Sequence, residues 1–471
     1  MTVLLCLIQI TNTLINMKFN FSLALYLISF IADAQSAEIT SWLINTTGLT
    51  GSHYVNNNPT AIQDAVAANV QSVQYSDNWV YITATGIPSY TTGPFLDGNP
   101  SLATNQNSIF RITRNPLPPV GAPDNTTGGN IGIFINGVAL FDYRDGVAWN
   151  PTTNSLCGGP GNPPCPGGPG AAMDWNRDAI PAERAGFDCA KGHPAMGNYH
   201  HHQNPSAFDL DLVVISDICS IYDADGLYAI DSSVHSPLIG FAYDGYPIYG
   251  AYGYANEDGT GGIVRMKSGY VLRDMTDRTT DPAGATVQSG PVVSATYPLG
   301  YFREDYRFDS VAASASDVLD EHNGRFCVTP EYPQGMYCYF ATVDENWNST
   351  YPYVVGPQFY GDNTGSRVNS ITETTETYDP SLAVNDTPKV NEIELYPNPG
   401  NDFIAIQLSG LAKFDWDIEV FDSSGNKVKS SRIKQGSTIA YIDTTELYSG
   451  NYFVRIQEGD FLLSKSFVLI K

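Results

Sequence analysis

The chain has 471 residues, of which 42% are hydrophobic and 15% are charged, and its formal net charge is −25 at pH 7. This length predicts two or three domains with hydrophobic cores. The acidic balance argues against binding to nucleic acid, whose phosphates require a basic surface, and it suits an exported protein that holds Ca²⁺. With 43 Gly, 30 Pro and few charged residues, the composition predicts a mainly β fold.

The first 34 residues have the features of a signal peptide. Lys18 precedes an apolar run from Phe19 to Ile31, and Ala32-Asp33-Ala34 then supplies the small-x-small pattern that a signal peptidase requires. This run is too short to span a bilayer comfortably. We therefore expect export, with no transmembrane anchor in the mature chain.

The cysteines outside this segment are even in number, which in an exported protein predicts disulfides. They are Cys157, Cys165, Cys189, Cys219, Cys327 and Cys338. Close spacing favours the pairs Cys157–Cys165 and Cys327–Cys338, which leaves Cys189 with Cys219. Six cysteines allow fifteen sets of disulfide pairs, so the alternative sets stay open.

Residues 35–173 predict an N-terminal β region that is continuous with the central region after it. Its strands alternate apolar and polar residues, and Asn136-Gly137 favours a hairpin turn. Residues 157–170 are so rich in Gly and Pro that they predict a surface loop. Further on, residues 362–390 are rich in Ser, Thr, Asn and Asp, which predicts a flexible linker.

Residues 391–471 predict a small β-sandwich of six or seven short strands. With Tyr396-Pro397-Asn398-Pro399 near its start and Leu447 to Tyr452 as LYSGNY, this module resembles the C-terminal sorting domain of the type IX secretion system of Bacteroidetes. The resemblance implies that the secretion machinery is a partner through residues 391–471. It also implies a secreted or outer-surface protein, with attachment to cell-surface lipopolysaccharide as one outcome. A plain adhesion domain is the alternative.

The central region, residues 174–361, contains four blocks of aromatic, glycine and histidine residues. They are DWNRDAIPAERAGFDCAKGHPAMGNYHHHQNP, HSPLIGFAYDGYPIYGAYGY, LDEHNGRFCVTPEYPQGMYCYF and YPYVVGPQFYG. In this order they resemble the YHYH family of secreted bacterial proteins, whose motif stands here as Tyr199-His200-His201-His202. The resemblance implies a domain and leaves the reaction and the substrate open.

The histidines of this motif predict a metal site. In an extended segment His200 and His202 project to one face, whereas Tyr199 and His201 project to the other. Two imidazoles on one face are suited to Cu²⁺ or Zn²⁺, and His193 is the nearest further ligand. We therefore predict a divalent metal, copper or zinc, at His193, His200 and His202. Other candidates lie further off, namely Asp188, His235 and His322 as ligands and Asp188 or Asp209 as acceptors that orient a ring.

Three alternatives remain open for this region. One is a metal-free extracellular hydrolase or lyase with a histidine as general base. Glu183 and Glu331, near the histidine and PEYP segments, are a separate candidate pair of acid and base. Another is a structural or adhesive module in which the histidines only pack. A third, weaker indication is calcium at the YDADGLYAID segment, where Asp223, Asp225 and Asp231 match only part of a calcium loop.

Two pairs of segments also resemble each other within the chain. The DCAKGH sequence from Asp188 is echoed by DEHNGR from Asp320, and FINGVALFD by FAYDGYPIYG. This predicts an internally duplicated β domain in which one copy keeps the histidines. Chance similarity among glycine-aromatic turns is the alternative.

Overall fold

The computed structural model describes residues 35–471 except 97–100, 120, 160, 169–172, 212–218, 220, 223–224, 381–392, 409–411, 413–414, 424 and 459–460. The predicted signal peptide, residues 1–34, lies outside the described residues. Contacts divide the chain after Ser36, and the elements below all belong to the unit from Ala37 to Lys471. Within the described ranges, no helix combines the length and the apolar character needed to cross a membrane.

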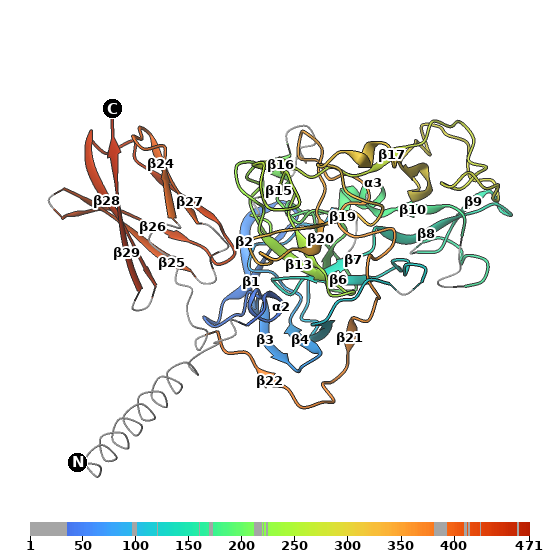
Figure 1. The fold of residues 1–471 in the computed structure, drawn as a ribbon, viewed down its shortest axis with the longest axis horizontal. Helices are drawn as coiled ribbons and strands as arrows, with labels where there is room; N and C mark the ends of the chain where they lie inside the picture. The colour runs from blue at the N-terminus through green and yellow to red at the C-terminus, as the bar shows by residue number, and fades with distance from the viewer. Residues whose placement is uncertain are drawn as a thin grey trace, which may run out of the picture. The chain divides into compact units, whose positions relative to one another are not determined.

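The centre of the protein is an eight-stranded sheet (Figure 1). Its strands lie in the order β11 (His193–Ala195), β12 (Asn198–His201), β7 (Ala139–Phe141), β6 (Asn130–Phe134), β13 (Leu238–Ala242), β14 (Pro247–Tyr249), β20 (Met336–Phe340) and β19 (Gly324–Cys327). Most residues of these strands are buried, which explains why they read as apolar and aromatic runs. The fold is mainly β, as the composition predicts.

The two halves of this sheet repeat each other about its centre. In each half an outer antiparallel hairpin, β11–β12 or β19–β20, joins an inner antiparallel hairpin, β6–β7 or β13–β14, through a parallel pair of strands. The halves meet where β6 and β13 pair antiparallel, with Ile133 opposite Phe241. The registers match as well, because His201 pairs with Leu140 in one half and Tyr339 pairs with Ile248 in the other. The structure thus supports the predicted duplication.

The loops that lead into the outer hairpins also match. Lys191 and Asn323 both adopt left-handed backbone conformations, with φ of 63° and 66°. The glycine that follows each of them, Gly192 or Gly324, lies against a tyrosine ring that a Cβ atom would strike. Only glycine fits there, so the shared Asp-x-x-x-Gly pattern is a packing requirement.

A five-stranded sheet lies in the N-terminal region, in the order β21 (Ser366–Val368), β5 (Ser108–Thr113), β4 (Trp79–Ala84), β3 (Val70–Tyr75) and β22 (Glu376–Thr377). Its apolar side chains belong to the same buried cluster as those of the eight-stranded sheet, so the two share one core. Because β21 and β22 pair with β5 and β3, this part of the predicted linker runs along the sheet.

The remaining elements of the main domain are short. The strands are β1 (Thr50–Val55), β2 (Asn58–Ala67), β8 (Arg144–Asn150), β9 (Ser155–Cys157), β10 (Asn176–Asp178), β15 (Tyr252–Tyr254), β16 (Ile263–Arg265), β17 (Tyr270–Leu272) and β18 (Tyr306–Phe308). The helices are α2 (Ala37–Thr40) and α3 (Ala179–Glu183), with 3₁₀ turns at η1 (Arg184–Gly186), η2 (Phe208–Leu210), η4 (Arg303–Asp305) and η5 (Ala312–Ser314).

The C-terminal module is built from two sheets. One has the order β23 (Ile393–Tyr396), β24 (Phe403–Leu408) and β27 (Ile439–Asp443), and the other β26 (Lys427–Ile433), β25 (Trp416–Asp422), β28 (Gly450–Glu458) and β29 (Phe461–Leu469). Their alternating apolar residues form a single buried cluster. This is the small β-sandwich that the sequence predicts.

Two of the three predicted disulfides are confirmed. Cys157 is bonded to Cys165, and Cys189 to Cys219. The predicted Cys327–Cys338 bond is wrong, because both thiols are buried and unbonded. By register the two cysteines are diagonal neighbours, because Cys338 lies opposite Arg325 and Cys327 lies opposite Met336. Their thiol groups contact each other through a hydrogen bond and not through a disulfide.

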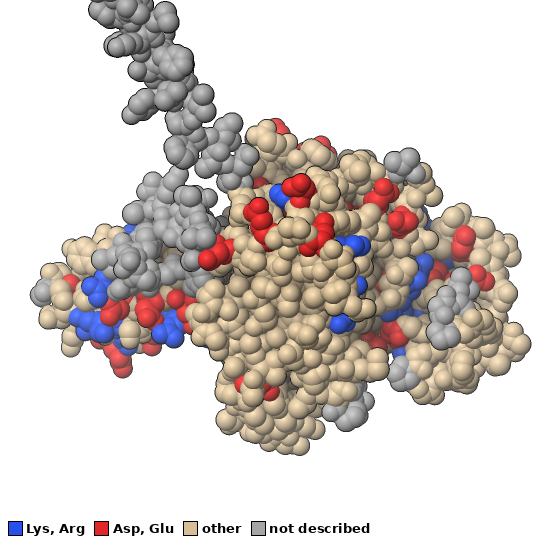
Figure 2. All heavy atoms as spheres, turned by 90° about the horizontal axis from the view of Figure 1, so that it is seen from below, with Lys and Arg blue, Asp and Glu red and all other residues tan. Residues whose placement is uncertain are grey.

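Charged side chains occupy a minor part of the surface drawn in Figure 2 and gather in a few places on it. Uncharged residues cover most of this face, and Lys and Arg lie among Asp and Glu. This distribution is expected for a chain with only 15% charged residues.

Candidate functional site

The candidate site is built on the outer hairpin of the first half. β11 and β12 are joined by Met196 and Gly197, both with positive φ, which is the geometry of a tight two-residue hairpin turn. The pairing of the two strands sets His193 directly opposite His200. His202 is the residue directly after β12. Its side chain lies on the same side of the hairpin as that of His200, as the strand alternation predicts.

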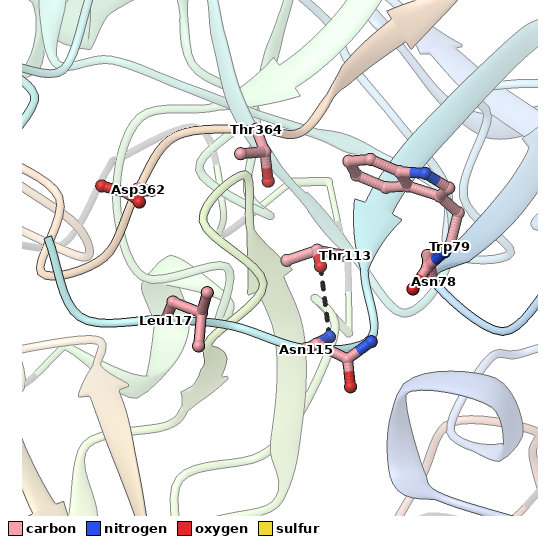
Figure 3. Close-up of a pocket in the computed structure, with 7 residues that line it drawn as sticks. All are labelled: Asn78, Trp79, Thr113, Asn115, Leu117, Asp362 and Thr364. Atoms are coloured by element: carbon pink, nitrogen blue, oxygen red, sulfur yellow. Dashed lines mark hydrogen bonds between the residues drawn. The ribbon is translucent and has the colours of Figure 1, made fainter. Parts of the chain in front are cut away.

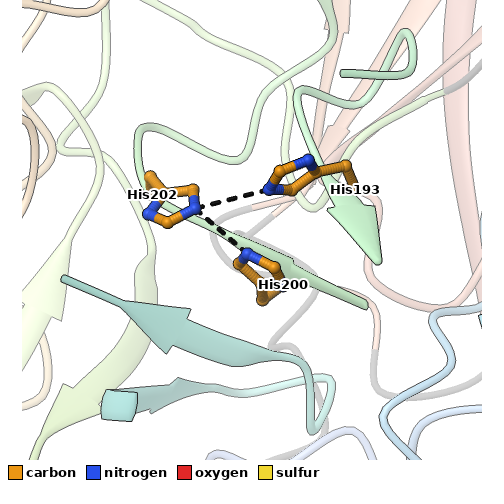
Figure 4. Close-up of side chains that lie close together, drawn as sticks. All are labelled: His193, His200 and His202. Carbon is orange, nitrogen blue, oxygen red and sulfur yellow. Dashed lines mark hydrogen bonds between the residues drawn. The ribbon is translucent and has the colours of Figure 1, made fainter. Parts of the chain in front are cut away.

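The structure brings these three side chains, called the histidine cluster below, into one group (Figure 4). The Nε2 atom of His202 lies 3.0 Å from that of His200 and 3.4 Å from that of His193. The three potential ligand atoms all lie within 4.8 Å of one another, and all three residues are buried. Among the described residues this is the one group of histidine, cysteine and acidic side chains with metal-binding spacing.

Two backbone carbonyls fix the orientation of two rings. The Nδ1 atom of His200 lies 2.8 Å from the carbonyl oxygen of Asn198, and the Nδ1 atom of His202 lies 2.6 Å from that of Asp142. Because a carbonyl oxygen only accepts, each Nδ1 must carry the hydrogen. The Nε2 atoms that face each other are therefore lone-pair donors when the rings are neutral, which is the form that binds metals.

Aromatic rings pack around the cluster. Phe141 stacks on His200, with ring centroids 3.9 Å apart, and Phe187 meets His193 edge-on at 4.9 Å. These contacts restrict the imidazoles and exclude water from two sides of the cluster.

Glu183, the last residue of α3, brings a carboxylate to the cluster. Its Oε2 atom lies 3.3 Å from Nε2 of His193 and 3.4 Å from Nε2 of His202. Burial favours the neutral form of Glu183, but the contact with His202 and the charges of both histidines outweigh it and lower the pKa.

The pKa values of two buried histidines are shifted in opposite directions. The pKa of His200 is well below its ordinary value because of burial and of the charges of His202 and His193. Burial also opposes the charged form of His202, but Glu183 outweighs it and raises the pKa of this imidazole.

His201 belongs to the opposite face and is separate from the cluster. Its Nε2 atom is 2.8 Å from the hydroxyl of Tyr90, and its Nδ1 atom is 3.1 Å from the carbonyl oxygen of Lys191. Burial lowers the pKa of His201 to about 3, so the ring is neutral. Of the three consecutive histidines, this one belongs to the core.

Asp188 is neither a ligand nor a ring-orienting acceptor in this arrangement. Its carboxylate accepts hydrogen bonds from the Tyr199 hydroxyl at 3.0 and 3.1 Å and from the backbone N–H groups of Gly93, Ala190 and Gly192. We call this contact the Asp188–Tyr199 latch. The second half has the same contact, since Tyr337 donates to both carboxylate oxygens of Asp320 at 2.9 Å.

The other predicted candidates lie elsewhere. His235 packs against Tyr249 and Tyr254, and His322 reaches the carbonyl oxygen of Gln358. Glu331 accepts a hydrogen bond from Tyr249, so it does not pair with Glu183 as an acid and base. The Asp209 side chain and Asp223 lie outside the described residues. Asp231 accepts from Ser233, and neither it nor Asp225 joins a described metal-binding group.

A separate pocket of about 300 Å³ lies between the ends of β4 and β5 and the chain after Gly361 (Figure 3). It is lined by Asn78, Trp79, Thr113, Asn115, Leu117, Asp362 and Thr364. None of these residues belongs to the histidine cluster, so the pocket adds nothing to the site.

Sequence reasoning missed two parts of the site. It named Glu183 only as an acid or base, because nothing in the sequence shows that the end of α3 meets the hairpin. It also missed the Asp142 carbonyl, since a backbone acceptor leaves no trace in the sequence. The parallel pairing of β12 with β7 places the residue after β7 beside His202.

Comparison with known proteins finds two family matches. The model described as "Secretion system C-terminal sorting domain" matches residues 394–471, and the one described as "YHYH protein" matches residues 109–352. No curated protein matches the chain.

The first match establishes where the protein acts. A type IX sorting domain marks an exported protein that is handled by the secretion machinery and is secreted or held at the outer cell surface. The second match starts upstream of the boundary predicted at residue 174 and includes both halves of the eight-stranded sheet. Because it spans more than half of the 471 residues, the chain belongs to the YHYH protein family.

Proposed function

We propose that this exported protein binds a divalent transition metal ion through the Nε2 atoms of His193, His200 and His202. The observation that carries the proposal is the 3.0 Å separation of the His200 and His202 Nε2 atoms while both Nδ1 atoms face carbonyl oxygens.

This arrangement requires a positive ion between the rings. Two neutral imidazoles that both donate through Nδ1 present only lone pairs at Nε2, and two lone pairs at 3.0 Å repel each other. Either a proton or a metal ion resolves this repulsion. The third ring supports the metal, since His193 lies within the same 4.8 Å group.

The ligand set favours copper or zinc. Imidazole nitrogen suits Zn²⁺ and Cu²⁺, whereas Ca²⁺ prefers six to eight oxygen ligands. Three buried histidines offer no such oxygen shell. Cys327 and Cys338 lie in the other half of the sheet and do not contribute.

The duplicated half argues against a purely structural role for the cluster. By register, the positions of His193, His200 and His202 correspond to Arg325, Cys338 and Phe340. The second half therefore forms the same hairpin, the same parallel pairing and the same aspartate–tyrosine contact without any of the three imidazoles. The scaffold does not need histidine at these positions.

The test is metal content. The purified protein, stripped by chelator and then dialysed against limiting Zn²⁺ or Cu²⁺, is compared with His200→Gln and His202→Gln by elemental analysis. His53→Gln is the matched control, because His53 pairs with Asp64 outside the cluster. We expect about one equivalent of metal in the wild type and the control, and loss of most of it in the two cluster variants. Equal metal in all four proteins would contradict the proposal, with folding checked by circular dichroism.

A proton in place of the metal is the competing outcome. It would appear as a wild-type protein that holds no metal and whose stability and spectra are unchanged by chelator. That result would favour the metal-free histidine chemistry instead.

A further inference from the structure

We infer that Glu183 is the fourth ligand of this site, so that the metal ion is held by three histidines and one carboxylate. The inference rests on the proposed metal binding and adds a residue, a coordination number and a consequence for chemistry.

The position of Glu183 is set by secondary structure on both sides. Asp178 caps the N-terminus of α3 by accepting from the backbone N–H of Ile180, and the 3₁₀ turn η1 follows directly after Glu183. The helix end therefore holds the carboxylate over the hairpin. Its side chain is 26% exposed, whereas those of His193 and His202 are 8% and 3% exposed, so Glu183 covers the solvent side of the cluster.

The partners of this carboxylate are two histidines of the cluster itself. Its Oε2 atom is buried and makes no contact that has the geometry of a hydrogen bond. Among the described residues, the ion pairs of Glu183 are those with His193 and His202, and no Lys or Arg lies within ion-pair distance. A buried, unsatisfied carboxylate oxygen is costly, and a metal ion would satisfy it.

The four separations that join Glu183 or His202 to His193, and His202 to Glu183 or His200, are close to those of tetrahedral coordination. Ligand atoms about 2.05 Å from a zinc ion, at tetrahedral angles, lie about 3.3 Å from one another. The observed separations between Glu183 Oε2 and the Nε2 atoms of His193 and His202 are 3.3 and 3.4 Å, and His202 lies 3.4 and 3.0 Å from the other two rings. The whole histidine cluster spans 4.8 Å, so binding must draw its widest pair together.

The net charge of a buried metal site also favours Glu183 as a ligand. A divalent cation among neutral imidazoles would carry its full charge into a buried site, and one carboxylate halves the net charge. Neighbouring carboxylates are already engaged: Asp145 pairs with Arg177, and Asp178 accepts from Tyr353 at 2.7 Å. Glu183 is the one that faces the rings.

A fourth protein ligand changes what the metal can do. Zinc sites with four protein ligands are typically structural, whereas catalytic sites keep one position for water or substrate. A site closed by Glu183 would hold the ion, and would stabilise the hairpin against α3, without activating a water molecule.

The experiment compares wild type, Glu183→Gln and the surface control Glu257→Gln, because Glu257 is exposed and lies outside the cluster. Zinc affinity is measured by competition with a chromophoric chelator, and Co²⁺ is used as a spectroscopic probe of coordination. We expect Glu183→Gln to bind zinc at least about tenfold more weakly and to give an altered Co²⁺ spectrum, with the control unchanged. Glu183→Ala provides a second variant, and thermal unfolding of the metal-free proteins separates loss of a ligand from loss of folding.

The possible failures are distinguishable. Wild-type affinity and an unchanged Co²⁺ spectrum in Glu183→Gln would overturn this inference alone, and metal binding by the histidines would stand. A wild-type protein that binds neither ion would overturn both proposals.

Discussion

The duplicated sheet allows a matched test of how the hairpin supports the site. Tyr199→Phe removes the hydroxyl of the Asp188–Tyr199 latch in the half that carries the histidines. Tyr337→Phe removes the corresponding hydroxyl from Asp320 in the other half. Both tyrosines are buried, and both donate to two carboxylate oxygens, so the two substitutions are closely comparable.

The expected loss of stability depends on the contacts that remain. A hydrogen bond to a charged group contributes about 1.5–3 kcal/mol to the free energy of unfolding. After Tyr199→Phe, Asp188 keeps three backbone donors, those of Gly93, Ala190 and Gly192. Burial raises the pKa of Asp188 to about 7, so the carboxyl is only partly ionised at neutral pH. We therefore expect a loss near the lower end, about 1.5–2 kcal/mol, for this variant and a similar loss for Tyr337→Phe.

Metal affinity should separate the two variants. The latch ties the loop before β11 to β12, and so holds His193 opposite His200. Its loss should weaken Zn²⁺ binding about tenfold, the lower end of the range for residues that support ligands, whereas Tyr337→Phe should bind like wild type. Urea unfolding of the metal-free proteins and chelator competition provide the two measurements. Equal weakening of metal binding in both variants, or no loss of stability in Tyr199→Phe, would refute the reasoning.

Three further outcomes are expected from the structure. Burial raises the pKa of Asp244 to about 6. Since this pKa exceeds the value of about 3.9 in the unfolded chain, the folded state binds the proton more tightly. The free energy of unfolding should therefore fall by up to about 3 kcal/mol as the pH rises from about 4 to about 6. Asp244→Asn should remove this slope in urea titrations at several pH values. Cys157→Ser with Cys165→Ser opens a loop of sequence separation 8, which should cost at most about 2.5 kcal/mol in thermal unfolding and leave metal content unchanged. Phe141→Ala removes the ring stacked on His200. Because Phe141 is only half-buried, the free energy of unfolding should fall by about 2 kcal/mol, less than the roughly 3–5 kcal/mol of a fully buried phenylalanine. Zinc affinity should decrease as well, and calorimetry can check both.

The period of a β-strand explains which features of the site could be predicted. Alternation alone places His200 and His202 together and sends His201 to the other face, where it contacts Tyr90. Composition and turn residues similarly predict a mainly β fold and the separate C-terminal sandwich. These inferences depend on local geometry, which short stretches of sequence determine.

Features that depend on register or on tertiary contacts could not be predicted. The Cys327–Cys338 pairing failed because spacing along the chain does not reveal that the two cysteines are diagonal neighbours across β19 and β20, with a hydrogen bond and no disulfide between their thiols. Glu183 reaches the cluster because α3 packs on the hairpin, and this tertiary contact cannot be inferred from the sequence. The predicted linker likewise contains β21 and β22, whose pairing partners are far away in the sequence.

The duplicated architecture also indicates how a site could arise in one half only. Each half inserts a different segment between its inner and outer hairpins. In the first half this segment carries α3, which delivers Glu183 to His193 and His202. In the second half, Arg325 stands in the place of His193 and donates to backbone carbonyls, including that of Ser316 at 2.8 Å. The same hairpin position thus serves packing in one half and gathers potential ligands in the other. Because the shared scaffold fixes backbone and register, the difference in chemistry must come from the inserted segment and from the side chains that face it.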